Sequence, residues 1–305
     1  MENSKRKIVE SVPNYSEGTD SQKVEQIVNE IKNTSNTRIV DVQYDSDYNR
    51  AVITFVGIPE AVLRANIAAA KKAVELIDMN KHKGQHPRIG AVDVVPFVPA
   101  QNVTIEECIK LSKEFAEAMA NEGIPVYLYE ESATQMERIN IDNIRIGEYE
   151  GLKEKIKTDP NKKPDYGPSE FHPTAGATIT GARYPLISFN INLGTKDVNI
   201  AKKVAKAIHL RSGGLVNVKA MGTIIEGKNY VQVGISNINY KKTPLYRQIE
   251  LVRLEASRYG VPIVGTELIG VLPLGAVLNS LEYYLQLEKP SKLEPNHLLE
   301  SYFDF

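Results

Sequence analysis

Two histidines of this 305-residue chain, His82 and His86, stand four positions apart in a segment rich in lysine and arginine. On one face of a helix, such a pair could hold a metal ion. A helix is not expected here, because Gly84 weakens it and Pro87 biases His86 toward extended backbone. The segment is therefore predicted to be a shaped loop, and we expect no metal ion there.

His82 remains as an imidazole on a loop that also carries Lys81, Lys83 and Arg88. An imidazole can accept and release protons near neutral pH, and neighbouring cations favour its neutral form and attract an anionic substrate. A general acid–base role for His82 is one interpretation. A solvated basic loop with a structural histidine is the other, since loops also collect charge for solubility.

The elements that must position this loop follow from apolar periodicity and from turn and capping residues. A helix beginning at Pro59 precedes the loop, a strand over residues 91–98 follows it, and Thr104 with Glu107 forms a capping box that opens the next helix. The predicted buried face of the first of these helices is Val62, Leu63, Ile67, Ala70, Val74 and Ile77. The other elements expected in the first half are strands over 8–13, 38–42, 51–56 and 126–129, and a helix that carries Val24, Ile27, Val28 and Ile31.

The second half is expected to repeat this order. Its predicted elements are strands over 186–193, 215–220, 230–236 and 263–268, and helices over 197–210, from Pro244 onward and over 273–285. Strand, helix, strand, strand, helix, strand is the order of split βαβ, ferredoxin-like units. We therefore predict an α+β fold of two duplicated ferredoxin-like units, each a helix-backed four-stranded sheet, divided into residues 1–180 and 181–305.

Residues 153–181 differ in composition, being rich in Lys, Pro, Gly and Thr. So long a stretch without evident secondary structure is typical of a functional loop in a compact protein. A flexible linker has the same composition. Both interpretations stay open on these residues alone.

Composition excludes several classes of protein. A formal net charge of -1 lacks the basic excess of nucleic-acid-binding chains, so no nucleic-acid partner is expected. Cys108 is the single cysteine, so we expect no disulfide within the chain, no Cys/His metal site and a reducing compartment such as the cytoplasm. The N-terminus has no apolar segment, and the longest apolar run, residues 268–278, is short and interrupted. Neither a signal peptide nor a membrane span is expected.

Longer blocks of sequence carry a resemblance that covers nearly the whole chain. They are VPNYSEG at 12–18, Asn49 with Arg50, residues 82–99, RIGEYEGL from Arg145, and residues 167–169, 176–178, 180–183 and 189–196. In these blocks, and in their order, the chain resembles the glutamate formiminotransferase family, also called glutamate formimidoyltransferase. Motifs this long and in this order are highly specific.

The resemblance implies transfer of a formimidoyl group between N-formimidoyl-L-glutamate and tetrahydrofolate, a one-carbon step of histidine degradation. It also implies that His82 corresponds to the catalytic proton-transfer residue of the family. The glutamate amine loses a proton when it becomes a nucleophile and the departing N5 gains one, so one imidazole could serve both. Tetrahydrofolate is then the co-substrate, and no metal is needed.

The resemblance implies a folate site on two segments. The first segment is Gly167, Pro168, Ser169, Glu170, Phe171, His172, Pro173, Thr174, Ala175 and Gly176. The second is Ile208, His209 and Leu210, where relatives often carry arginine in place of His209. Histidine does not supply the fixed, forked charge of arginine, so a role for His209 in folate binding stays open.

Both substrates carry carboxylates, which arginine binds through two parallel hydrogen bonds. Arg50, Arg88 and Arg183 are therefore candidate carboxylate clamps. Surface ion pairing is the alternative for each of them.

Other functions remain as alternatives. A glutamate formyltransferase using 5-formyltetrahydrofolate would employ the same residues, and a non-catalytic folate-binding protein would keep the loop at 167–176 without needing His82. A pair of RNA-binding ferredoxin-like domains would need a basic face that the near-neutral charge does not supply. The family implies a homodimer, and because the chain ends at Phe305 we expect any cyclodeaminase to be a separate protein.

Overall fold

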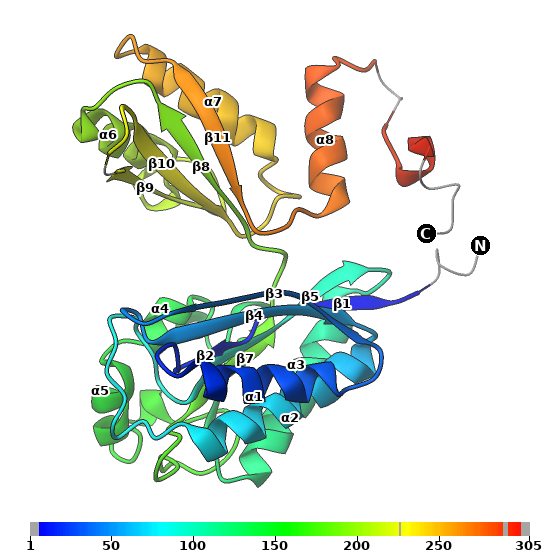
Figure 1. Cartoon of the computed structure of the whole chain (residues 1–305), viewed down its shortest axis with the longest axis vertical. Coiled ribbons are helices and arrows are strands. Elements are labelled where there is room, and N and C mark those ends of the chain that lie inside the picture. Colours follow the sequence, from blue (N-terminus) through cyan, green and yellow to red (C-terminus); the bar gives the residue numbers. More distant parts are fainter. Residues whose placement is uncertain (1–5, 226, 289–291, 300–305) are drawn as a thin grey trace. The chain divides into compact units, whose positions relative to one another are not determined.

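The computed structural model describes residues 6–225, 227–288 and 292–299. The chain forms two compact units, one ending at Arg183 and the other beginning at Tyr184 (Figure 1). Both units combine helices with a β-sheet, so the chain is a mixed α and β protein, as expected. No helix among the described residues is long and apolar enough to cross a membrane.

The first unit is built on a seven-stranded sheet, so the prediction of four strands is wrong for this unit. The strands are β1 (Ile8–Ser11), β2 (Asn14–Tyr15), β3 (Thr37–Asp45), β4 (Arg50–Gly57), β5 (Val92–Gln101), β6 (Val126–Leu128) and β7 (Thr178–Ala182). β1 pairs with β4 and β5 in antiparallel fashion, and β7 pairs in parallel with β5 and β6. The sheet is therefore mixed.

Two of the additional strands, β2 and β7, were not predicted because turn and loop residues are frequent in their segments. β2 is two residues long and pairs with both β4 and β5, although its Asn14 is typical of a turn. β7 is buried along its whole length between β5 and β6. A strand buried on both faces lacks the alternation of apolar and polar residues by which a half-exposed strand is recognised.

Helices α1 (Ser21–Lys32), α2 (Pro59–Leu76) and α3 (Ile105–Asn121) cover one face of the first sheet (Figure 1). The predicted buried face of α1 and the Thr104–Glu107 capping box of α3 are both confirmed. On α3, Cys108 is fully buried, and burial, followed by the charge of Glu107, raises the pKa of its thiol to about 12.

The predicted buried face of α2 is only partly correct. Val62 and Ala70 are buried, whereas Leu63, Ile67 and Val74 are partly exposed. Most of the buried residues of α2 are small: Ala61, Ala65, Ala69, Ala70 and Ala73. α2 contacts both α1 and α3, and alanines permit close approach between helices, so small side chains take the most buried positions.

Two short helices that the sequence did not predict follow β6. They are α4 (Ile141–Ile144) and α5 (Glu148–Lys155), and Figure 1 shows them at one end of the first sheet. Gly147 precedes α5 with a φ of 86°, a left-handed conformation that glycine adopts without strain. This turn separates Arg145 from Glu148 and Glu150, three charged residues that belong to the candidate site.

The second unit has the predicted four-stranded sheet. Its antiparallel strands β8 (Ile187–Leu193), β9 (Val218–Ile224), β10 (Val231–Asn237) and β11 (Ile263–Ile269) lie in the order β11-β8-β10-β9. α6 (Val198–Ile208) packs on β9 and β10 of this sheet. α7 (Leu245–Ser257) contacts α6 and contributes to the same hydrophobic core, and α8 (Leu274–Tyr284) contacts α7. Asp197 caps α6, and Pro244 directly precedes α7.

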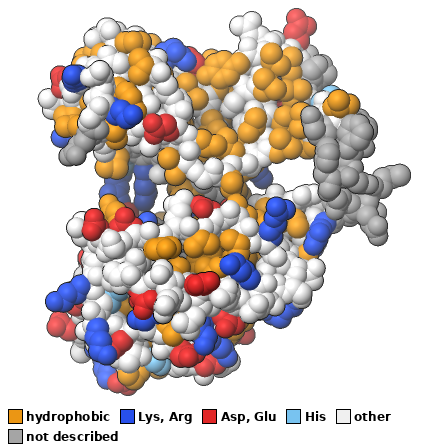
Figure 2. Space-filling view, viewed as in Figure 1, with side chains coloured by type: hydrophobic (Ala, Val, Ile, Leu, Met, Phe, Trp, Pro, Cys, Tyr) orange, Lys and Arg blue, Asp and Glu red, His pale blue; other side chains and the backbone are white. Residues whose placement is uncertain are grey.

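Hydrophobic side chains gather on the surface of the second unit, shown in orange in Figure 2. β11 and α8 contribute many of the exposed ones: Val264, Leu268, Ile269, Leu274, Val277, Leu281, Tyr283 and Tyr284. Clusters of exposed apolar residues are typical of surfaces that associate with another protein.

Gly90 joins two segments of the first unit that are far apart in sequence. It forms an isolated β-bridge with Gly176, and a Cβ atom on Gly90 would lie 2.0 Å from the carbonyl oxygen of Ala177. Backbone oxygens cannot move aside as a flexible side chain can. Only glycine therefore permits this approach.

Gly90→Ala should lower the free energy of unfolding by about 1–3 kcal/mol, the range for inserting a methyl group where no space exists. Urea unfolding followed by circular dichroism measures this. Gly151→Ala is the matched control, because Gly151 lies in α5 with open space around it, and it should stabilise by about 0.5–1 kcal/mol. Equal stability of the two variants would contradict the close approach.

Candidate functional site

His82 is half-buried and held through both ring nitrogens. Its Nε2 lies 2.9 Å from the carbonyl oxygen of Asn49, and the Nε of Arg88 donates to its Nδ1 over 3.3 Å. A carbonyl only accepts and a guanidinium only donates, so the ring is the neutral tautomer with its proton on Nε2. Nδ1 therefore carries the lone pair, which accepts from Arg88.

Arg88 is fixed by two carboxylates of α5. Its Nη1 lies 2.6 Å from Glu148 and 3.0 Å from Glu150, and its Nη2 lies 2.6 Å from the other oxygen of Glu150. The Arg88 side chain is only 8% exposed, so these partners provide the charge compensation that a buried guanidinium needs. This candidate clamp is thus occupied within the described structure.

Asn49 connects three segments around the His82 ring. Its Oδ1 accepts from the backbone N–H of Gly18 at 2.9 Å, and its Nδ2 donates to the carbonyl of Lys83 at 2.8 Å. Its φ of 47° lies in the left-handed region, which asparagine tolerates better than most residues. The side chain thereby directs the backbone carbonyl of Asn49 to His82.

The surroundings lower the pKa of both histidines. Burial is the main cause for His82; the hydrogen bond to Asn49 raises its pKa, and the charge of Arg88 lowers it. Burial is also the main cause for His86, whose pKa falls to about 4, and the charge of Arg50 adds to the effect. Both rings are therefore neutral at pH 7.

His82 and Arg88 line a cavity of about 690 Å³ in the first unit. The other lining residues are Met79, Asn80, Lys83, Gly84, Tyr149, Glu150, Lys153 and Glu154. Sites for small molecules fall in this range of volume and combine apolar walls with a few placed polar groups.

The candidate folate loop, residues 167–176, is attached to the His82 loop. The carbonyls of Thr174 and Pro173 accept from the backbone of Met79 at 2.7 Å and from the side chain of Asn80 at 2.8 Å. The ring of Phe171 is buried, 5.4 Å from the ring of Tyr149. The structure thus brings this loop and the His82 cavity together within one unit.

Within this loop, His172 has a local structural role. Its Nδ1 accepts from the backbone N–H of Ala175 at 3.1 Å, and its own backbone pairs with Gly176 in a β-bridge. Burial lowers the pKa of His172. The ring therefore shapes the turn that ends the loop.

The second candidate folate segment lies in the second unit. Ile208 is buried at the end of α6, Leu210 is 45% exposed, and Nδ1 of His209 accepts from the backbone N–H of Arg211. A cavity of about 240 Å³ is lined by His209 and by three cations, Lys202, Lys206 and Arg211. Sequence reasoning missed Arg211, two positions after the residue that it compared with an arginine.

The two other candidate clamps differ in their surroundings. Arg50 is half-buried and forms no ion pair with the described residues. Arg183 lies close to Tyr129 and Glu10. Burial raises the pKa of both groups, and the positive charge of Arg183 lowers it. Arg50 is therefore the candidate with free hydrogen-bonding capacity.

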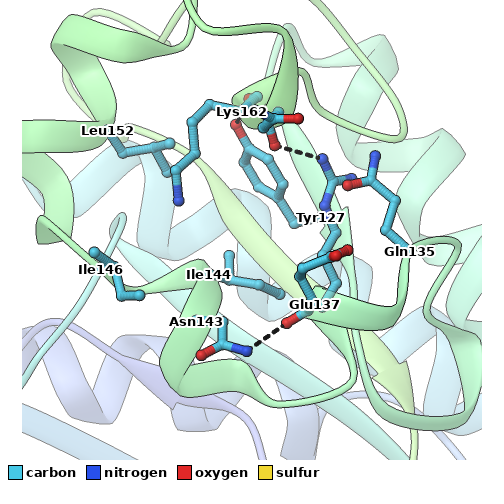
Figure 3. A pocket seen from close by; sticks show the side chains of 10 residues that line it. Tyr127, Gln135, Glu137, Asn143, Ile144, Ile146, Leu152 and Lys162 are labelled. Atoms are coloured by element: carbon cyan, nitrogen blue, oxygen red, sulfur yellow. Dashed lines mark hydrogen bonds between the residues drawn. The ribbon is translucent and has the colours of Figure 1, made fainter.

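Figure 3 shows a second cavity in the first unit, of about 560 Å³, which shares no lining residue with the His82 cavity. Tyr127, Ile144, Leu152 and Lys162 are among its lining residues. Its buried Arg138 is already paired with Asp165 at 2.6 Å. Arg138 is therefore already neutralised within the chain.

The contacts of Glu148, Glu150 and Asn49 with Arg88 and His82 were not predicted from the sequence. The contacting residues lie 33 to 62 positions apart, beyond the reach of spacing arguments. Among the described residues, no three His, Cys, Asp or Glu side chains form a group that could hold a metal ion.

Arg88→Met should raise the pKa of His82 toward its ordinary value, because a nearby cation that disfavours the imidazolium is removed. NMR titration of the His82 ring protons measures this change. Lys81→Met is the control: Lys81 is 85% exposed and pairs with Asp78, so its loss should leave His82 unchanged. A fall in the pKa of His82 in Arg88→Met would contradict the assigned contact.

Comparison with known families covers both units. Residues 8–183 match the Formiminotransferase domain, N-terminal subdomain, and residues 188–303 match the Formiminotransferase domain. The chain is similar to the glutamate formimidoyltransferase of Streptococcus pyogenes serotype M1, with 43% identity over 96% of this chain and 99% of the relative.

Two further relatives differ in length. The glutamate formimidoyltransferase of Thermoplasma acidophilum is 46% identical over 92% of this chain and 93% of its own length. The formimidoyltransferase-cyclodeaminase of Dictyostelium discoideum is 43% identical over 92% of this chain but over 53% of its own length. The matches to both units and to full-length relatives show that this chain belongs to the formiminotransferase family.

Proposed function

We propose that this chain transfers a formimidoyl group between N-formimidoyl-L-glutamate and tetrahydrofolate, with His82 as the general acid–base. The reaction is supported by the identity of 43% and 46% to two glutamate formimidoyltransferases over most of the chain. The observation that carries the assignment of His82 is its neutral ring at the wall of a 690 Å³ cavity, with an Nδ1 lone pair that accepts a 3.3 Å contact from Arg88.

The transfer requires one proton to leave one nitrogen and one to reach the other. N5 of tetrahydrofolate attacks the formimidoyl carbon, and its proton passes to Nδ1 of His82. The bond from that carbon to the glutamate nitrogen then breaks, and the proton from His82 reaches the departing nitrogen. The reverse reaction uses the same positions, so one imidazole serves both half-steps.

The contact with Arg88 suits this use of Nδ1. At 3.3 Å it is longer than the contacts of Arg88 with Glu148 and Glu150, so it is the contact of Arg88 that a substrate proton would replace. Arg88 also disfavours the imidazolium that forms during transfer. A less stable imidazolium gives up its proton more readily to the leaving nitrogen.

Folate binding is proposed for residues 167–176 and for Ile208, His209 and Leu210. The first loop is supported by its hydrogen bonds to Met79 and Asn80 beside the His82 cavity. For the second segment, Arg211 offers the forked charge that His209 lacks. Loss of folate affinity in Arg211→Gln, but not in His209→Gln, would support this division of roles.

We also propose that residues 1–180 and 181–305 are duplicated split βαβ units. In the first, β1, β3, β4 and β5 pair in the order β3-β4-β1-β5; in the second, the order is β9-β10-β8-β11. With α1 and α2, or α6 and α7, between the strands, both follow one connectivity. Experimental structures of the units whose four strands cannot be superposed would argue against duplication.

A cytoplasmic homodimer that delivers its product to a separate cyclodeaminase is proposed for the intact protein. The exposed apolar side chains of β11 and α8 support association. The formimidoyltransferase-cyclodeaminase of Dictyostelium discoideum, a longer relative, supports a cyclodeaminase as the partner that receives the product. Light scattering that gives the mass of one chain would argue against the dimer.

His82→Ala should lower turnover by about 10²–10⁴-fold with folate affinity retained, as expected for loss of a positioned acid–base group. Turnover is measured from the consumption of N-formimidoyl-L-glutamate and, separately, with 5-formyltetrahydrofolate as donor. His297→Ala is the control, because this exposed histidine lies outside the proposed site. It should retain full turnover.

The pH profile of the wild-type enzyme supplies the second criterion for His82. Since the ring must be neutral to accept a proton and its pKa is lowered, the rate should rise with pH through a single group below 6.5 and then level off. Full turnover of His82→Ala, with this rising limb unchanged, would refute the assignment.

Gly176→Val should weaken folate binding by about tenfold or more, equivalent to about 1.4 kcal/mol per factor of ten. Gly176 has a φ of 75°, and a Cβ there would lie 2.6 Å from the carbonyl of Ile89, so the loop must move. Gly123→Val is the matched control, with a φ of 77° and open space. Equal calorimetric affinities, with both variants folded, would remove the loop from the folate site.

A further inference from the structure

Arg145 and Asp93 form a buried ion pair close to the His82 site. Nη2 of Arg145 contacts Asp93 Oδ2, and Asp93 Oδ1 accepts from the backbone N–H of Ile89 at 3.0 Å. The side chains are 13% and 2% exposed. Both oxygens of Asp93 therefore have hydrogen-bond partners within the chain, and Arg145 is the cation in direct contact with it.

The Nε of Arg145 is a buried donor that this pair does not use. It has no hydrogen-bond partner among the described residues. An unpaired N–H of a buried guanidinium costs free energy, because its hydration has been lost without replacement. Such a donor points to an acceptor that arrives from outside the chain.

Arg50 adds a positive charge that has no direct ion pair to the group around this donor. It is half-buried at the start of β4 and has no ion-pair partner among the described residues, although Asp45 and Asp93 lie close enough to attract it. Burial, followed by the charge of Arg145, lowers the pKa of Arg50. The positive charges of Arg50 and Arg145 therefore repel each other, and burial leaves little water to screen them.

His86 completes the group with a neutral imidazole. Arg50, Arg145 and Arg88 oppose its protonation and Asp93 favours it, after burial as the largest cause. Arg88 is already neutralised by Glu148 and Glu150. Of the three arginines that act on His86, Arg50 is therefore the one without a carboxylate in direct contact among the described residues.

We propose that Arg50, the free Nε of Arg145 and His86 form a binding site for a substrate carboxylate. Guanidinium groups bind carboxylates through short, charge-assisted hydrogen bonds, and a neutral imidazole adds one N–H donor. Arg50 directly follows Asn49, whose carbonyl accepts from His82, so a carboxylate held here lies next to the acid–base group. The assignment rests on the proposed function for the identity of the substrate.

Two substrates could supply this carboxylate: the glutamate moiety of N-formimidoyl-L-glutamate, and the glutamate tail of the folate. The chemistry of recognition is the same for both. Their Michaelis constants separate them. A rise in KM for N-formimidoyl-L-glutamate alone assigns the site to the amino acid, and a rise for tetrahydrofolate alone assigns it to the folate tail.

Binding is tested by calorimetry with glutarate and with p-aminobenzoyl-glutamate, which imitate the two sources without the reacting groups. Arg50→Gln should weaken binding of the relevant probe by about tenfold to a hundredfold. Arg145→Lys keeps a cation for Asp93 but removes the Nε donor, and should weaken it by about tenfold. Arg64→Gln removes an exposed arginine charge from α2 and should leave affinity unchanged.

The ring of His86 reports on the site without any turnover. Bound carboxylate favours the imidazolium, so the pKa of His86 should rise from about 4 when the probe is added, as measured by NMR. If Arg50→Gln and Arg145→Lys bind both probes as the wild type does, the proposal is wrong. Probe binding needs no transfer chemistry, so this failure is distinct from a failure of formimidoyl transfer.

Discussion

The buried charge of Arg88 is the constraint around which the first unit is arranged. A guanidinium that is 8% exposed must have anionic partners, and Glu148 and Glu150 reach it across about 60 positions of sequence. The short helix α5 therefore has to dock beside the strand that follows Arg88. The same contact leaves Nε of Arg88 directed to His82, so charge compensation and the orientation of the imidazole have one cause.

The histidine is thus held between segments that meet only in the folded chain. Asn49, at the turn before β4, accepts from one side of the ring, and Arg88 donates to the other. Behind them, residues 167–176 join the same loop through Met79 and through the bridge between Gly90 and Gly176. Because hydrogen bonds and ion pairs within the chain hold the imidazole, its orientation does not depend on a contact with substrate.

The sequence predicted elements well where local signals are strong. The capping box at Thr104 and the apolar periodicity of α1 identified these helices correctly. β7 and the alanine-rich face of α2 were missed, because a doubly buried strand and a close helix contact are decided by tertiary packing. At the site, blocks of sequence pointed to His82 and its loop, whereas the Glu148–Arg88 contact lies beyond any spacing rule. The catalytic role of His82 remains a prediction.

The position of Cys108 has a practical consequence. The chain has no other cysteine, and this thiol is fully buried on α3 with a pKa near 12, so it is scarcely ionised at neutral pH. The thiolate is the form that reacts with maleimides and oxidants. A cysteine placed on the surface by mutagenesis would therefore be the sole site for a fluorophore or spin label, with the native sequence otherwise intact.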